Sequence, residues 1–115
     1  MIFGSHVIVY SQDATADRDF FRDVLGSSSV DAGNGWLIFA LPPAEVAVHP
    51  TEGSVSADLY FMCDDLHADM QALAANGVTC SRVEEARWGS VTKFCLPGGA
   101  EVGLYQPKHP SPLSI

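Results

Sequence analysis

The feature that most constrains this chain is a repeat of its first half in its second half. Asp13 and Asp65 each stand immediately before a helical pattern of apolar residues. The segments 41–50 and 96–107 both begin with Leu-Pro, share Ala-Glu-Val and end at a proline. A shared helix start and a shared final strand, in the same order, indicate duplication. We therefore expect one supersecondary unit to be built twice.

The first half predicts a strand, a helix and three further strands. Asp13 can cap the helix by accepting from free amides of its first turn, and Gly26 can end it in a left-handed conformation. The sequence Gly33-Asn34-Gly35 predicts a hairpin turn, and Pro42 and Pro43 interrupt any strand that follows. Strands are expected at 5–10, 27–32, 36–40 and 45–49, where β-branched and aromatic residues gather.

The second half predicts the same order of elements. Asp65 can cap a helix whose apolar residues recur at helical spacing until Asn76-Gly77, and Pro97-Gly98-Gly99 predicts a turn before the last strand. Strands are expected at 58–63, 78–83, 90–96 and 101–106. Each half is thus βαβββ and the fold class is α+β. We expect a single domain over 1–115, made of units 1–52 and 53–107 and a tail at 108–115.

Charge and length exclude several classes of partner. The chain has 115 residues, which is typical of one domain, and its net charge of −8 repels phosphate backbones and anionic lipid headgroups. No apolar run approaches the ~20 residues needed to span a bilayer, and the first residues do not resemble a signal peptide. Neither a nucleic acid nor a membrane is an expected partner, and the expected location is the cytoplasm.

Cysteine usage argues against a disulfide framework or a zinc knuckle. Cys63, Cys80 and Cys95 are odd in number, widely spaced and form no Cys-x-x-Cys pair. All three lie in or beside apolar segments, so we expect reduced thiols that act as small apolar side chains.

Three segments carry a resemblance to a known family. They are a first strand that opens with His6, a helix that ends in Phe-Phe-Arg-Asp-Val-Leu-Gly, and a closing Leu-Pro-Gly-Gly-Ala-Glu-Val-Gly-Leu-Tyr-Gln-Pro. Together they resemble the vicinal oxygen chelate superfamily of glyoxalases, bleomycin-resistance proteins and extradiol dioxygenases. The resemblance implies curved mixed sheets around a shared cleft, and often a homodimer. In metal-dependent members, it implies one ligand on the first and one on the last strand of each unit.

The ligand set that the resemblance implies is incomplete here. Its first-strand positions fall on His6 and Asp58, which can bind a metal, but its last-strand positions fall on Ala47 and Gly103, which cannot. A zinc ion typically takes at least three protein ligands. Four polar residues lie on the same strand faces, two positions away from Ala47 and Gly103: Glu45, His49, Glu101 and Tyr105. They could form a metal site that is displaced along the strands, or they could be a hydrogen-bonded lining of the cavity.

Catalytic candidates are His6, as donor, acceptor or base, and the equivalent carboxylates Glu45 and Glu101. Carboxylates brought close together raise one another's proton affinity, which suits general acid–base work. The alternative, which is more usual for carboxylates, is that both flank turns and point into water. His49 could contact a ligand or satisfy a loop carbonyl. We expect no role for His67 or for His109 in the tail.

Aromatic residues could line a ligand cleft as well as a core. Tyr60, Trp88 and Tyr105 are the candidates for the cleft, together with His49. Trp88 falls in a predicted connection, where burial in the core is least expected, so it could instead form a dimer contact.

Two functions remain open from the sequence. The first is a metal-free binding protein that holds a neutral or cationic small molecule in a polar and aromatic cleft. The alternative is a lyase, isomerase or dioxygenase that uses one divalent metal ion to polarise a small oxygenated substrate. The missing ligands favour the binding protein without a cofactor.

Overall fold

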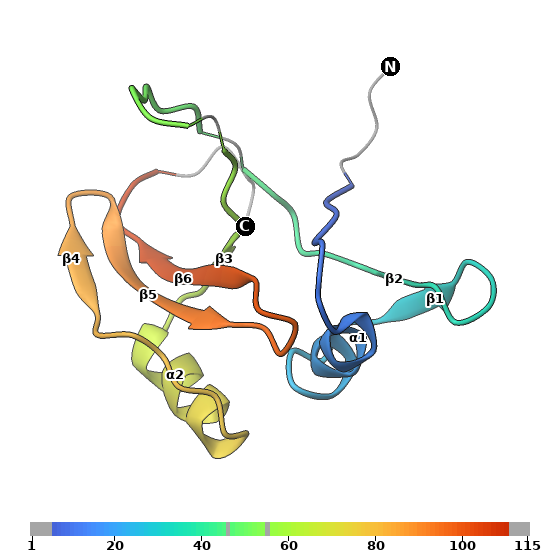
Figure 1. Ribbon diagram of the computed structural model, residues 1–115. Coiled ribbons are helices and arrows are strands. Elements are labelled where there is room, and N and C mark those ends of the chain that lie inside the picture. Colours follow the sequence, from blue (N-terminus) through green and yellow to red (C-terminus); the bar gives the residue numbers. More distant parts are fainter. Residues whose placement is uncertain (1–5, 46, 55, 111–115) are drawn as a thin grey trace.

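The computed structural model describes residues 6–45, 47–54 and 56–110 (Figure 1). The elements of these residues are α1 (Ala14–Asp23), β1 (Ser29–Asp31), β2 (Leu37–Phe39), β3 (Tyr60–Met62), α2 (Leu66–Ala75), β4 (Glu84–Ala86), β5 (Gly89–Cys95) and β6 (Glu101–Pro107). These helices and strands make the protein α+β, as the sequence predicts. Within the described residues, neither helix has the length and apolar character of a membrane span.

The second half forms a complete βαβββ unit. Its strands make one sheet in the order β3-β6-β5-β4, in which β3 runs parallel to β6 and the other pairs are antiparallel. The helix α2 lies against one face of this sheet (Figure 1). Leu66 and Leu73 of α2 pack there with Phe94, Val102 and Leu104 of the strands. Most of the buried core of the described residues belongs to this half.

The first half is incomplete, and two predicted strands are wrong. The hairpin of β1 and β2 forms as expected, with Val30 opposite Ile38. However, residues 6–10 and the described residues of 45–49 are not strands; Ser5 and Val46 lie outside the described residues. The first unit is thus a helix and a hairpin over the described residues.

The two halves differ in whether their opening and last segments pair with each other. In the second half, the opening strand β3 is held by the last strand β6, with Tyr60 opposite Gly103. In the first half the described residues of the matching last segment pair with no strand, and the Glu45 side chain is hydrogen-bonded to Tyr105 of β6. Without that neighbour, an opening strand at 6–10 has no ladder to join.

The expected strand at 78–83 is also wrong, because the chain bulges before β4. Ser81 N–H donates to the Lys93 carbonyl, but the Lys93 amide donates to the Ser81 side chain rather than to its backbone. The hydroxyl of Thr92 then donates to the Ser81 carbonyl at 2.6 Å. By Glu84, which pairs with Val91, the register has shifted by one residue, as at a β-bulge.

Both predicted helix caps are confirmed. The Asp13 carboxylate accepts from Ala16 N–H and the Asp65 carboxylate from Ala68 N–H, each at 3.1 Å. The predicted hairpin turn is confirmed as well, because Asn34 has a φ of 53°, a left-handed conformation that asparagine tolerates. The two caps and the turn each depend on residues that are only a few positions apart in the sequence.

The two halves meet where α1 lies beside the β5–β6 turn (Figure 1). Asp17, which is only 7% exposed, accepts a hydrogen bond from Gly98 N–H at 2.6 Å, and Gln12 N–H donates to the Gly98 carbonyl. Phe20 of the same helix packs against Phe94, with ring centroids 6.1 Å apart. A buried charged hydrogen bond and an aromatic pair therefore join α1 to the second unit.

The cysteines are free thiols with different surroundings. Cys63 and Cys80 are partly buried against the core, whereas Cys95 is exposed. Burial, followed by the charge of Asp69, raises the pKa of Cys63 to about 11. Cys63 therefore stays protonated at neutral pH, consistent with a small apolar side chain.

Gly98→Ala should lower the free energy of unfolding by about 1–3 kcal/mol, the usual cost of overpacking. A Cβ at residue 98 would overlap the Ser11 hydroxyl and lie 2.7 Å from Asp17 Oδ2. Urea denaturation would measure the loss. Gly53→Ala is the matched control, since its Cβ would meet only the Thr51 hydroxyl at 3.5 Å. Equal stability of the two variants would contradict a close joint at Gly98.

Candidate functional site

Three aromatic rings meet on the sheet face opposite α2. Tyr60 comes from β3, Tyr105 from β6, and Trp88 from the turn between β4 and β5. Their ring centroids are 6.3 Å apart for Tyr60 and Trp88, 5.9 Å for Tyr60 and Tyr105, and 5.3 Å for Trp88 and Tyr105. All three pairs are edge to face, the arrangement that aromatic quadrupoles favour. We call Tyr60, Trp88 and Tyr105 the aromatic triad.

The triad depends on a glycine in the neighbouring strand. Tyr60 lies directly on the backbone of Gly103, which is its partner in the β3–β6 register. A Cβ at Gly103 would overlap two carbons of the Tyr60 ring. Alternation along β6 places Gly103 and Tyr105 on this face and Val102 and Leu104 in the core. Only glycine therefore lets the Tyr60 ring approach β6 this closely.

Two titratable side chains adjoin the triad. The Tyr105 hydroxyl donates to Glu45 Oε1 at 3.2 Å, and His109 Nε2 lies 3.4 Å from that hydroxyl and 3.8 Å from Glu45 Oε1. The Glu45 side chain is only 14% exposed. Glu45, His109 and the triad together form the candidate site, which combines flat apolar area with a partly buried carboxylate.

The hydroxyl at the centre of the site stays protonated. Burial, and then the hydrogen bond to Glu45, raise the pKa of Tyr105 above its ordinary value. Near the site, Lys108 binds Glu85 at 2.8 Å, and Lys108 and then Ser90 hold the pKa of Glu85 below its usual range. Tyr105 is therefore a hydrogen-bond donor at any physiological pH.

The structure brings some predicted site residues together and separates others. Tyr60, Trp88, Tyr105 and Glu45 meet in one cluster. Glu101 instead forms an ion pair with Lys93 at 3.7 Å, at the far end of β6 from Tyr105. The remaining candidates are exposed: His6, His49 and Asp58.

The residues present do not fit the metal ion that the fold family implies. Among the described residues, no three His, Cys, Asp or Glu side chains gather in a group that could hold an ion. At Gly103, where the family would place a ligand, the Tyr60 ring fills the space of a side chain.

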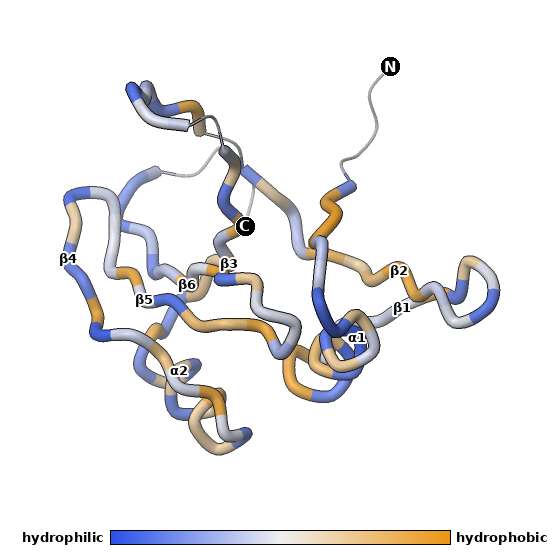
Figure 2. The backbone as a smooth tube through the Cα atoms, in the orientation of Figure 1, coloured by the Kyte–Doolittle hydropathy of each residue, from blue (hydrophilic) through white to orange (hydrophobic). Residues whose placement is uncertain are grey.

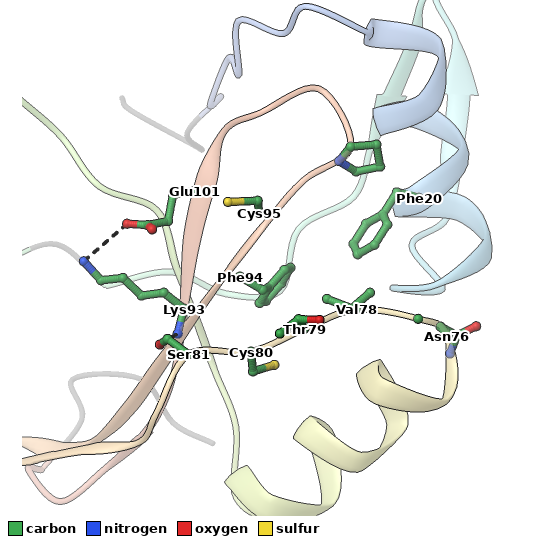
Figure 3. Close-up of a pocket in the computed structure, with 12 residues that line it drawn as sticks. Phe20, Asn76, Val78, Thr79, Cys80, Ser81, Lys93, Phe94, Cys95 and Glu101 are labelled. Atoms are coloured by element: carbon green, nitrogen blue, oxygen red, sulfur yellow. Dashed lines mark hydrogen bonds and ion pairs between the residues drawn. The ribbon is translucent and has the colours of Figure 1, made fainter.

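A separate hollow of about 610 Å³ lies at the other end of the sheet (Figure 3). Phe20 and Phe94 face it, while Lys93 and Glu101 pair at one side. Its volume suits a small molecule, but its one charged pair is exposed and already neutralised. The aromatic cluster with its partly buried carboxylate is the better candidate site.

His109 is the site residue that sequence reasoning missed. It was expected to be inert because it lies in a Pro-rich tail, but its ring lies 6.0 Å from that of Tyr105. The sequence carries no signal for it, because the deciding contact is tertiary: Lys108 N–H continues the strand by donating to the Trp88 carbonyl, so the tail begins as an extension of β6. A residue four positions beyond Tyr105 then lies on the same side.

Similar solved structures share this fold. TnmS3, an antibiotic binding protein from Streptomyces sp. CB03234, has a TM-score of 0.64 and 26% identity, over 90% of this chain and 100% of that one. A glyoxalase/bleomycin resistance protein from the same organism has a TM-score of 0.61 and 27% identity, over 85% and 95%. Lactoylglutathione lyase from Agrobacterium tumefaciens has a TM-score of 0.66 at 18% identity, over 88% and 90%.

These similarities confirm the resemblance to the vicinal oxygen chelate superfamily, and the chain has the glyoxalase/bleomycin-resistance fold. No family model matches the sequence, and no curated protein matches it significantly. The fold is thus shared with both binding proteins and enzymes, so the function must be argued from the site.

Gly103→Ala should lower the free energy of unfolding by about 1–3 kcal/mol by displacing the Tyr60 ring. The same change in a Tyr60→Ala background should cost much less, because the space is then empty. Urea denaturation of both single variants and of the double variant gives the coupling energy. Additive effects would show that the ring does not occupy this position in solution.

Proposed function

We propose that the protein is a metal-free small-molecule binding protein, and that its ligand is a planar aromatic compound that is neutral or positively charged. The aromatic triad carries this proposal, because three aromatic rings stand on one sheet face with Trp88 38% exposed. Exposed flat rings bind other flat rings by stacking and attract cations to their faces.

The charge of the site supports a neutral or cationic ligand. Glu45 places a carboxylate beside the triad, and the chain carries a net charge of −8. An anionic ligand would be repelled by both. Similarity to an antibiotic binding protein at 26% identity is consistent with a role in holding such a compound. We further propose that it acts in the cytoplasm, with its thiols reduced.

The proposal can be tested with two probes that differ in charge. N-methylphenanthridinium is a permanent planar cation, and phenanthridine is its uncharged parent ring near neutral pH. Both should bind in isothermal titration calorimetry, with tighter binding of the cation, and Trp88→Ala should weaken both by about tenfold, as expected for lost stacking. Trp36→Phe, at a tryptophan outside the site, should keep the wild-type affinity.

Failure of both probes to bind, combined with tight zinc, nickel or manganese binding by calorimetry, would overturn the proposal in favour of a metal-dependent enzyme. Glu45→Gln separates charge from stacking: it should remove the preference for the cation while leaving the affinity for phenanthridine unchanged.

We propose in addition that two copies of the chain associate through their first halves. Among the described residues, every large apolar side chain that is exposed lies between positions 7 and 48, except Trp88: Val7, Ile8, Tyr10, Val30, Trp36, Ile38, Leu41 and Val48. Figure 2 shows apolar segments on the run before α1 and on β2. An identical patch on each copy can be self-complementary about a twofold axis.

Sedimentation velocity should therefore detect a dimer. Ile38→Asp and Val48→Asp should shift the protein to a monomer, because each buries a charge in the interface. Thr79→Asp, an exposed change in the second half, should leave the dimer intact. A wild-type protein that sediments as a monomer at all concentrations would refute this part of the proposal.

A further inference from the structure

The hollow at the far end of the sheet is formed by both halves of the chain (Figure 3). Phe20 of α1 provides one part of its wall, and segment 76–81 with the neighbouring ends of β5 and β6 provides the rest. Its volume of about 610 Å³ lies within the range of about 300–1,000 Å³ that is typical of small-molecule sites. The residues that line it are different from those of the aromatic triad, Glu45 and His109.

Polar side chains of the wall are bonded to other parts of the protein. The Asn76 amide donates to the Ala72 carbonyl at 3.0 Å. The Ser81 hydroxyl oxygen accepts from Lys93 N–H at 2.9 Å, and the Lys93 ammonium pairs with Glu101 at 3.7 Å. Because the two charged residues of the lining neutralise each other, a charged ligand would lose its water without gaining a counter-charge. The hollow therefore suits an uncharged ligand.

The accessible part of the wall consists of aliphatic groups rather than flat rings. Phe20 and Phe94 pack against each other with ring centroids 6.1 Å apart, and they are only 8% and 3% exposed. Little of either ring is thus open for stacking. Val78, Thr79 and Pro97 are more accessible. A compact saturated molecule fits such a wall better than the planar ligand that the triad favours.

The segment that closes the hollow, 77–80, is held by few hydrogen bonds. Val78 N–H donates to the Leu73 carbonyl at 3.0 Å, and the next backbone bond is from Ser81 N–H to the Lys93 carbonyl at 2.8 Å. The two residues between these donors form no hydrogen bond to the backbone of another described residue. The same segment also lines a second hollow, of about 420 Å³, against α2. It can therefore shift to fit a ligand at a small cost.

We propose that the hollow beside Phe20 is a second binding site, and that its ligand is a compact, saturated and uncharged small molecule. The site is separate from the aromatic triad, because Glu101 in its wall and Tyr105 of the triad lie toward opposite ends of β6. Phe20 belongs to the first half, and the other lining residues belong to the second. A bound molecule therefore contacts both halves and stabilises the joint between them.

Three probes of the same shape test the site. Adamantan-1-ol is rigid, saturated and uncharged, whereas adamantane-1-carboxylate is an anion and adamantan-1-amine is a cation at neutral pH. In NMR the alcohol should shift the amide signals of residues 78–80 and Phe94 and leave the Trp88 indole signal unchanged. A Kd of about 1 mM is expected for a ligand of this size. Both charged probes should bind at least about fivefold more weakly, because the hollow offers them no counter-charge.

Thr79→Trp should abolish binding of the alcohol, because a large side chain then fills the hollow from an exposed position of its wall. Thr51→Trp is the matched control, since Thr51 is exposed and lies outside the hollow, and it should keep the wild-type affinity. The amide signals of β6 show whether each variant is folded.

A second readout uses the unmodified chain. Cys95 is an exposed thiol that lines the hollow. Adamantan-1-ol at a concentration equal to its Kd should therefore slow the alkylation of Cys95 by iodoacetamide about twofold, as measured by mass spectrometry. N-methylphenanthridinium, the probe for the triad, should leave this rate unchanged.

Three results would overturn the inference: no effect of millimolar adamantan-1-ol on the amide signals or on the alkylation of Cys95, shifts at Trp88 instead of at 78–80, or wild-type affinity in a folded Thr79→Trp variant. The inference does not rest on the proposed function. Failure of the planar probes to bind would refute the triad as a ligand site and leave these results unchanged.

Discussion

The close approach of the Tyr60 ring to the Gly103 backbone is the contact on which the candidate site depends. It is possible because residue 103 has no side chain and because the β3–β6 register places Tyr60 opposite it. The ring then meets Trp88 and Tyr105 edge to face, and Tyr105 in turn reaches Glu45 and His109. The absence of a Cβ at Gly103 thus allows the contact to which both the apolar and the polar residues of the site are connected.

The same contact lies at a position where the family resemblance implies a metal ligand. The family resemblance assigns a metal ligand to the position of Gly103, but an aromatic ring fills that place. A ligand side chain and the Tyr60 ring cannot occupy the same volume. An aromatic ring therefore occupies this position of the sheet face, which is consistent with the proposed binding function.

The fold joins two halves of unequal character. The second half has its own sheet, helix and core, whereas the first contributes mainly Phe20 to the buried cluster. The hydrogen bond from Gly98 to the buried carboxylate of Asp17 ties them together. Exposed apolar residues accordingly gather in the first half, and the proposed association of two copies rests on them.

The sequence by itself determined what depends on neighbours along the chain. The caps at Asp13 and Asp65 and the left-handed turn at Asn34 need only residues a few positions away. The strands expected at 5–10, 45–49 and 78–83 were wrong because a strand exists only if a distant segment pairs with it. The described residues of the first two segments have no such pairing, and a bulge interrupts the third before β4. The site followed the same rule. Residue type alone made candidates of Tyr60, Trp88, Tyr105 and Glu45. Only the tertiary structure decided that these four meet, that Glu101 lies elsewhere and that His109 joins them. The reason is that sheet register determines which side chains come together.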